Sequence, residues 1–217
     1  KKDFACTDRM FANNVGVKFK TPEYVFEAEP ETDKWEYKSI ALDNYLTTDD
    51  DISRYESLSN EEQEIVLMCG YPGVGKSTFC KKYFSQYEVI NQDLLKTKNK
   101  CLKKAEEYIK MGNKVLIDNT NTTEETRKNY IDIAKKYKIP VKVVWIKIPF
   151  DVAQHLNNYR TQVSKGSIKM IPQIAYNTIR KNFIEPNLAE NIDEIIVIDR
   201  IIDFEFYANK ELHYQYI

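Results

Sequence analysis

Short apolar runs alternate with longer amphipathic segments from residue 65 onward. The runs are brief and rich in branched side chains, which is typical of buried strands, whereas the segments between them carry apolar residues at helical spacing. This alternation predicts an α/β fold with a mainly parallel sheet flanked by helices. The five expected strands are Ile65–Cys69, Glu88–Ile90, Val115–Ile117, Val141–Ile148 and Glu194–Ile198.

Turn-forming and capping residues mark the ends of the expected helices. Gly112 is predicted to end one helix, and Thr122 with Glu125 fits a capping box that begins the next. A polar stretch at residues 161–171 lacks periodicity and is predicted to form a lid. The helices between the strands are expected at residues 78–84, 101–111, 122–137, 151–160 and 172–183.

The chain before residue 61 has a weaker pattern. We expect a short helix from Phe11 to near Gly16, followed by a strand at Val17–Phe19. A second helix is expected to open at Thr21, because a proline follows it. Residues 30–60 are acidic and weakly periodic, so we predict that they form a linker or a peripheral layer.

Composition narrows the class of protein. With 217 residues, of which 42% are hydrophobic, the chain can bury a core, and this excludes a disordered or collagen-like protein. No apolar run approaches the roughly 20 residues of a transmembrane helix, and no signal peptide is visible, so we expect neither membrane insertion nor export. The four dispersed cysteines form no metal-binding pattern and are expected to be reduced. Because the chain does not begin with Met, we expect a fragment of a longer protein.

The formal net charge of −1 conceals two regions of opposite sign. Residues 21–64 contain fourteen acidic and three basic residues, a formal charge of −11, whereas residues 65–217 carry +7. Lysines are especially dense in residues 96–104. Such runs are commonly solvated faces, but an acidic connector before a basic body also suits a protein that binds a polyanion.

A phosphate-binding loop follows the first expected strand. Residues 70–77 fit the pattern GxxxxGK[ST], with a strand before and a helix after, as the motif requires. The glycines let backbone N–H groups surround phosphate oxygens, Lys76 reaches the β- and γ-phosphates, and the Ser77 hydroxyl binds Mg²⁺. We therefore predict nucleoside triphosphate binding through Gly70, Gly73, Val74, Gly75, Lys76, Ser77 and Thr78.

Polar residues after the second and third strands favour a kinase among proteins with such a loop. Phosphoryl transfer to an alcohol needs a carboxylate near the acceptor hydroxyl, and Asp93 has the expected position; its alternative role is a helix N-cap. Asp118 belongs to a polar rim or to a simple strand-end turn. Arg160, before the lid, could balance charge on the transferred group or could be an ordinary surface arginine. No guanine-binding NKxD motif is present, which disfavours a GTPase.

Taken together, these motifs resemble the kinase domain of the eukaryotic polynucleotide kinase/phosphatase family. The resemblance also extends to the start of the chain, since residues 1–24 are similar to the last part of that family's haloacid-dehalogenase-type phosphatase domain. The DxDxT nucleophile motif of such phosphatases is absent, so the resemblance implies that the phosphatase chemistry lies outside this chain. The matching kinase blocks are residues 70–79, 91–93, 115–121, 157–160 and 180–190.

The resemblance implies a role for individual residues. Lys76 and Ser77 would hold ATP and Mg²⁺, with Ser77 the metal ligand. Asp93 would be the general base that activates a nucleic acid 5′-hydroxyl, and Arg160 would face the phosphates from the lid. Arg180 is expected near the nucleotide.

A further group of residues is expected to bind the acceptor. Asp118 would lie near the reacting hydroxyl, and nearby lysines, including Lys114, would contact backbone phosphates. Gln92 and Asn158 depart from arginines that are common in the family. The expected acceptor-binding residues are Asp118, Asn119, Asn121, Arg127, Lys96, Lys98, Lys100, Lys103 and Lys104.

The resulting hypothesis is an ATP- and Mg²⁺-dependent polynucleotide 5′-hydroxyl kinase of DNA, or alternatively RNA, end repair. We expect a phosphatase tail at residues 1–29, an acidic connector at 30–60 and a P-loop kinase domain at 61–217. Two other functions stay open: a kinase for RNA or a small nucleoside-like acceptor, and an ATP-gated nucleic-acid scaffold without catalysis. We expect a monomer in the nucleus, or alternatively in the cytoplasm, whose repair-scaffold partners bind outside this chain.

Overall fold

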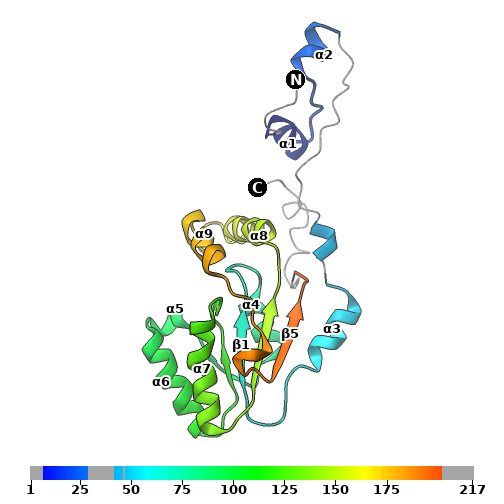
Figure 1. Ribbon diagram of the computed structural model, residues 1–217. Helices are drawn as coiled ribbons and strands as arrows, with labels where there is room; N and C mark the ends of the chain where they lie inside the picture. The colour runs from blue at the N-terminus through cyan, green and yellow to red at the C-terminus, as the bar shows by residue number, and fades with distance from the viewer. Residues whose placement is uncertain (1–6, 29–41, 46, 202–217) are drawn as a thin grey trace.

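The computed structural model describes residues 7–28, 42–45 and 47–201 of the chain (Figure 1). Its centre is a five-stranded sheet in the order β2-β3-β1-β4-β5, in which every neighbouring pair is parallel. Parallel strands need crossover connections, and helices supply them here. The strands are β1 (Ile65–Cys69), β2 (Glu88–Ile90), β3 (Val115–Ile117), β4 (Val141–Ile146) and β5 (Glu194–Ile198).

Within the described residues, helices precede the first strand and connect each strand to the next. The N-terminal part contains α1 (Thr7–Asn14), α2 (Pro22–Phe26), the 3₁₀ helix η1 (Leu42–Tyr45) and α3 (Asp49–Glu56). The rest contains α4 (Lys76–Tyr83), α5 (Gln92–Leu95), α6 (Lys98–Lys110), α7 (Glu124–Tyr137), α8 (Phe150–Val163), α9 (Gln173–Asn182) and the 3₁₀ helix η2 (Leu188–Glu190).

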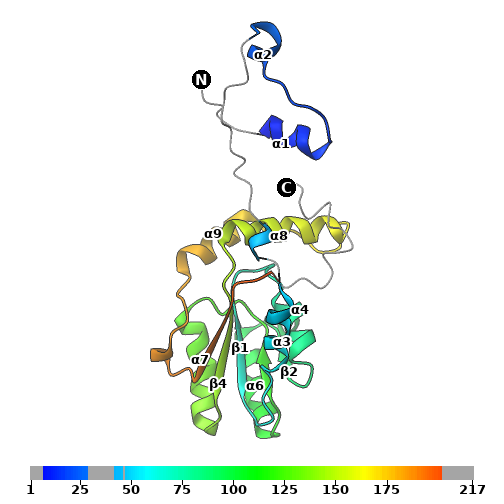
Figure 2. The ribbon, with the colours of Figure 1, turned by 90° about the vertical axis from the view of Figure 1, so that its right-hand side faces the viewer.

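Two apolar layers cover the two faces of the sheet. On one face α3, α4 and α8 contribute buried side chains such as Tyr55, Phe79 and Leu156, and on the other face α6 and α7 contribute Ala105 and Ile131. Figures 1 and 2 show α6 and α7 on the side of the sheet opposite to α3 and α4, with α8 and α9 across the carboxyl ends of the strands. Because β1 is buried along its whole length, it lies between both layers.

The structure confirms the five predicted strands, although β4 ends at Ile146, two residues earlier than expected. Two local predictions are wrong. Residues 17–19 form no strand, because no described segment pairs with them. The N-cap of α7 is Thr123, whose side chain accepts from Thr126 N, and not Thr122. The carbonyl of Thr122 instead accepts from Ile184 N at 2.8 Å, which ties this turn to the chain after α9.

The end of the expected connector packs on the sheet. Within α3, Tyr55 is fully buried against α4, and Leu58 lies at the edge of the same apolar layer. The structure also changes the expected lid, since residues 161–163 continue α8. Residues 1–6 and 29 of the expected phosphatase tail, residues 30–41 and 46 of the expected connector, and residues 202–217 of the expected kinase domain lie outside the described residues.

Candidate active site

The phosphate loop turns sharply between β1 and α4. Gly70 has a φ of 142°, and a Cβ atom there would lie 2.7 Å from the carbonyl oxygen of Ile146, so only glycine fits. Gly73 and Gly75 also have positive φ angles, and Gly75 is the N-cap of α4. The Tyr176 hydroxyl donates to Pro72 O at 2.7 Å, which fixes the loop from α9. The loop therefore presents the N-terminus of a helix to an anion.

A pocket of about 480 Å³ opens at this loop. Six of the seven loop residues predicted to bind nucleotide line it, and Gly70 lies outside it. The rest of the lining is largely apolar and comes from α8, the turn after it and Ile201, which follows β5. The lining residues are Gly73, Val74, Gly75, Lys76, Ser77, Thr78, Leu156, Tyr159, Arg160, Val163, Ser164, Ile168 and Ile201.

Lys76 is almost completely buried at the pocket floor. Its ammonium donates to Gly70 O at 3.1 Å and to Tyr71 O at 2.6 Å. Burial lowers the pKa of Lys76 to about 8, although the nearby Asp118 carboxylate opposes this shift. Burial disfavours the charged ammonium, whereas a bound phosphate would favour it. Phosphate binding would therefore offset the cost of burying this charge.

The Ser77 hydroxyl donates a hydrogen bond of 2.6 Å to Asp118 Oδ2. This contact joins the loop to the carboxyl end of β3. In the described part of the chain no group of three or more His, Cys, Asp or Glu side chains could hold a metal. Mg²⁺ nevertheless fits this pair, because the ion prefers oxygen ligands and commonly takes few from the protein and the others from phosphate and water. Asp118 is thus a candidate metal ligand that we did not predict as one.

Asn91 holds the two predicted acidic residues on one rim. Its side-chain amide donates to Asp118 O at 2.9 Å, and its Oδ1 accepts from Asp93 N at 2.7 Å. Asn119 Oδ1 accepts from Gln92 N at 2.9 Å, which joins the same two strand ends a second time. Asn91 is therefore the N-cap of α5, and Asp93, with an exposed side chain, is not.

Arg160 lines the pocket from α8. Its Nη2 donates to Asn157 Oδ1 at 3.0 Å, and Asn157 also donates to Ile171 O at the end of the expected lid. The buried Nε of Arg160 has no hydrogen-bond partner among the described residues. A cationic group with an unused donor in a pocket beside Lys76 is suited to a phosphate oxygen.

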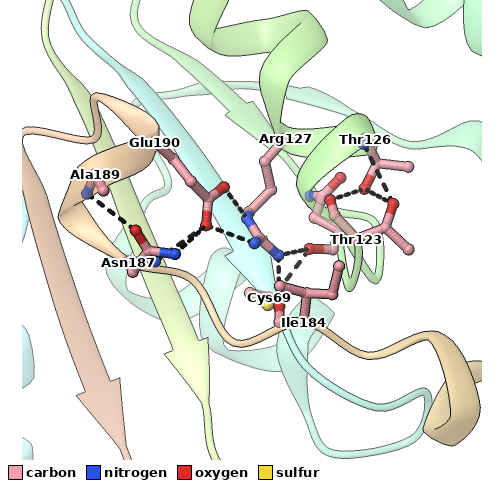
Figure 3. A network of polar contacts seen from close by, with 9 residues as sticks. Cys69, Thr123, Thr126, Arg127, Ile184, Asn187, Ala189 and Glu190 are labelled. Atoms are coloured by element: carbon pink, nitrogen blue, oxygen red, sulfur yellow. Dashed lines mark hydrogen bonds and ion pairs between the residues drawn. The ribbon is translucent and has the colours of Figure 1, made fainter.

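Arg127 is a structural residue at the centre of a buried polar network (Figure 3). It is 0% exposed, and its guanidinium makes two hydrogen bonds, of 2.7 and 2.6 Å, to the carboxylate of Glu190. It also donates to the carbonyl oxygens of Asn121 and Ile184. Asn121 is itself buried and donates to Met68 O at 2.8 Å. The burial of Arg127 and Asn121 contradicts the prediction that they contact the acceptor directly.

The predicted phosphate-binding lysines occupy different environments. Lys100 and Lys103 are exposed on α6, whereas Lys98 and Lys104 form exposed ion pairs with glutamates. Lys96 Nζ donates to Asp93 O at 2.5 Å, so it lies directly beside the predicted base. Lys114 lies apart from the other predicted lysines, because it precedes β3 and donates to Asn60 O at the amino edge of the sheet, away from the loop.

Other residues were missed or lie elsewhere. Arg180 is exposed, with its guanidinium 4.6 Å from the ring centre of Phe150, and it does not line the pocket. The apolar pocket residues, such as Tyr159 and Ile201, could not be told from ordinary core positions in the sequence. Glu190 was also missed, since a single acidic residue in a polar segment carries no signal of burial.

Comparison with known sequences identifies two families. Residues 95–186 match the AAA domain family, and residues 1–26 match the polynucleotide kinase 3 phosphatase family. The bifunctional polynucleotide phosphatase/kinase of Schizosaccharomyces pombe is 37% identical over 198 residues, 89% of this chain and 48% of the relative. A protein of Acanthamoeba polyphaga mimivirus assigned to the same class is 38% identical over 93% of this chain and 50% of the relative. The chain thus spans about half the length of these relatives.

Comparison with solved structures supports the fold. A gluconokinase from Sinorhizobium meliloti aligns with a TM-score of 0.51 and 14% identity, over 71% of this chain and 91% of that one. With the parallel sheet and the loop, this confirms the predicted P-loop kinase fold. No helix in the described ranges is long and apolar enough to span a bilayer. The chain is a relative of the bifunctional polynucleotide phosphatase/kinases, similar to half of each enzyme, and this confirms the resemblance predicted from the sequence.

Proposed function

We propose that this chain is an ATP- and Mg²⁺-dependent polynucleotide 5′-hydroxyl kinase. One observation carries the proposal: Asn91 ties Asp93 and Asp118 to one rim, and Asp118 accepts a hydrogen bond from Ser77 of the phosphate loop. A candidate base is thereby held beside a candidate triphosphate site, as transfer to an alcohol requires. The sequence relatives, which are named polynucleotide phosphatase/kinases, favour a polynucleotide as the alcohol.

Each residue has a distinct task in the proposed reaction. The 5′-hydroxyl oxygen forms a bond to the γ-phosphorus as the bond to the β–γ bridging oxygen breaks, and ADP leaves. Asp93 takes the hydroxyl proton. Lys76 and Arg160 bind the phosphate oxygens on which negative charge develops. Ser77 and Asp118 would hold Mg²⁺, which when bound would supply further neutralisation of this charge.

The remaining expectations follow from the same proposal. Residues 61–217 are the kinase domain, residues 30–60 the connector and residues 1–29 the tail of a 3′-phosphatase domain that belongs to the parent protein. DNA is the favoured acceptor, and nucleic-acid end repair in the nucleus is the corresponding role. Lys100 and Lys103, which are exposed on α6, are the proposed contacts for backbone phosphates. We expect a monomer whose repair-scaffold partners bind elsewhere in the parent protein.

An acceptor panel tests this function. The protein is incubated with γ-labelled ATP and Mg²⁺ in the presence of a 5′-hydroxyl oligodeoxynucleotide, the matching oligoribonucleotide or a free nucleoside. We expect label on the oligonucleotides and far less on the nucleoside. Preferred labelling of the nucleoside would replace the proposal with a small-molecule kinase, and ATP binding without transfer would favour a non-catalytic scaffold.

Substitution of the base completes the test. Asp93→Asn should lower the rate of transfer by about 10²- to 10⁴-fold, because the hydroxyl then loses its proton acceptor. Asp132→Asn, which alters an exposed acid on α7, is the matched control and should retain the wild-type rate. Equal rates for Asp93→Asn and the wild type would overturn the mechanism.

A further inference from the structure

The segment directly after β5 is held by the chain that precedes α3. Thr47 Oγ1 donates a hydrogen bond of 2.6 Å to Ile201 O, and Ile201 N donates one of 2.5 Å to Tyr45 O. Beside them, Arg200 Nη1 donates to Asn44 O at 2.8 Å. Three hydrogen bonds therefore join two segments that are more than 150 positions apart in the sequence.

Ile201 is also part of the pocket wall. It is 1% exposed and lines the pocket together with Tyr159, Val163 and Ile168. These side chains form the apolar part of a pocket whose polar part is the phosphate loop. An apolar wall suits the nucleobase of ATP better than its phosphates, since phosphates need donors and cations.

Two further contacts anchor the same connector. The Asp51 carboxylate lies 3.4 Å from Arg200 Nε, so α3 is tied to the residue before Ile201. The fully buried ring of Tyr55 packs edge-on against Phe79, with the ring centres 5.3 Å apart. Phe79 lies in α4, the helix that begins at the phosphate loop. The connector thus contacts both the apolar wall and the loop helix.

The acceptor rim is separate from these contacts. Among the described residues, no hydrogen bond joins residues 44–58 to Asn91, Asp93 or Asp118. A change in the connector should therefore reach the nucleotide and leave the acceptor hydroxyl largely unaffected.

We propose that the connector is a functional part of the ATP site, in which Thr47 and Arg200 are positioning residues that fix Ile201 against the nucleobase. This inference rests on the proposed binding of ATP. In this arrangement the N-terminal part of the protein affects the kinase site, because a displacement of residues 44–51 moves the apolar wall and weakens ATP binding. The residues that form the kinase site accordingly include some that precede residue 61.

Direct measurement of ATP binding tests the inference independently of phosphoryl transfer. By calorimetry with ATP and Mg²⁺, Thr47→Val and Arg200→Met should each raise the Kd by about fivefold or more, the effect of one lost hydrogen bond. Thr47→Ser keeps the donor and should restore the wild-type Kd. Ser53→Ala removes an exposed hydroxyl that donates to Asp49 O within α3, and as the matched control it should leave the Kd unchanged.

Steady-state kinetics distinguish positioning from general damage. The KM for ATP should rise in Thr47→Val while the KM for the oligonucleotide stays within about twofold, whereas a destabilised protein would lose active enzyme at unchanged KM values. Thermal melting of each variant establishes that it is folded, and Ile201→Ala repeats the test from the pocket side if Thr47→Val melts early.

The outcomes separate this inference from the proposed function. Folded Thr47→Val and Arg200→Met proteins that bind ATP as the wild type does would overturn the inference and leave the kinase proposal intact. A wild-type protein that binds ATP, responds to these substitutions and phosphorylates no acceptor would support the inference and overturn the kinase proposal. A wild type that does not bind ATP would overturn both.

Discussion

Arg127 and Glu190 form a buried ion pair in which two hydrogen bonds join α7 to η2 across 63 positions of sequence. The same guanidinium donates to Asn121 O, so the pair also holds the turn that follows β3. This turn leads from Asp118, which accepts the Ser77 hydrogen bond, into α7. The pair thereby supports the rim of the site without reaching it.

Glu190→Gln should strongly destabilise the protein. It leaves the Arg127 guanidinium buried without a compensating charge, and breaking such a pair costs about 3–5 kcal/mol of unfolding free energy. Urea denaturation measures this loss. Glu125→Gln, which breaks the exposed pair with Lys98, is the control and should cost about 1 kcal/mol or less. Similar losses for both variants would show that the Arg127 pair contributes no more than a surface pair.

Asp118→Asn should weaken the response to Mg²⁺. If Asp118 and Ser77 hold the ion together, loss of the carboxylate charge should raise the Mg²⁺ concentration for half-maximal activity by about tenfold or more. A titration of kinase activity with Mg²⁺ at saturating ATP measures it. Ser164→Ala removes another pocket hydroxyl, one that donates to Thr161 O, and should not change the titration. A raised KM for the oligonucleotide at an unchanged Mg²⁺ midpoint would instead assign Asp118 to the acceptor.

ATP binding should weaken at alkaline pH. Burial lowers the pKa of Lys76 to about 8, so the ammonium that meets the phosphates is present below this pH and is lost above it. Because bound phosphate favours the protonated form, binding above pH 8 includes proton uptake, and the Kd should rise by about tenfold per pH unit. Calorimetry from about pH 7.5 to about 9.5 measures this slope. Lys76→Met should bind weakly with no such slope, and a flat wild-type profile would contradict the prediction.

Gly70→Ala should disturb the loop far more than Gly112→Ala disturbs its turn. The new methyl group at residue 70 would lie 2.7 Å from Ile146 O, whereas nothing lies within 4 Å of a Cβ atom at Gly112. Both glycines have positive φ, so both changes carry about 1 kcal/mol of backbone strain, and only the first adds a clash. Denaturation and ATP binding together measure the difference. If both variants lost the same stability and Gly70→Ala bound ATP normally, the backbone at Gly70 and Ile146, at the ends of β1 and β4, would move apart easily enough to accept the methyl group.

Oligonucleotide binding should depend on salt through the exposed lysines of α6. Each lost phosphate contact should reduce the slope of log affinity against log salt by roughly 0.7–0.9. We expect Lys100→Gln and Lys103→Gln each to lower this slope in fluorescence-polarisation titrations. Lys135→Gln changes an exposed lysine at the other end of the sheet, on α7, and is the control. Slopes that stay equal in all three variants would place the nucleic acid on another surface.

The sequence by itself predicted the features whose signals are local. The five strands follow from apolar runs, and the loop from Gly70 to Ser77 follows from glycine, lysine and hydroxyl spacing that few other structures need. The sequence also predicted that Asp93 lies at the same edge of the sheet as the loop, because the carboxyl ends of parallel strands meet at that edge.

Only the tertiary structure decided which polar residues are accessible and which segments meet. Arg127 and Lys114 are both basic residues in a basic domain, yet one is buried against Glu190 and the other lies at the amino edge of the sheet. The contact of Thr47 with Ile201 joins positions 154 apart. Burial and contacts of this kind depend on how segments that are distant in the sequence pack together. The spacing of residues along the chain therefore predicts neither of them.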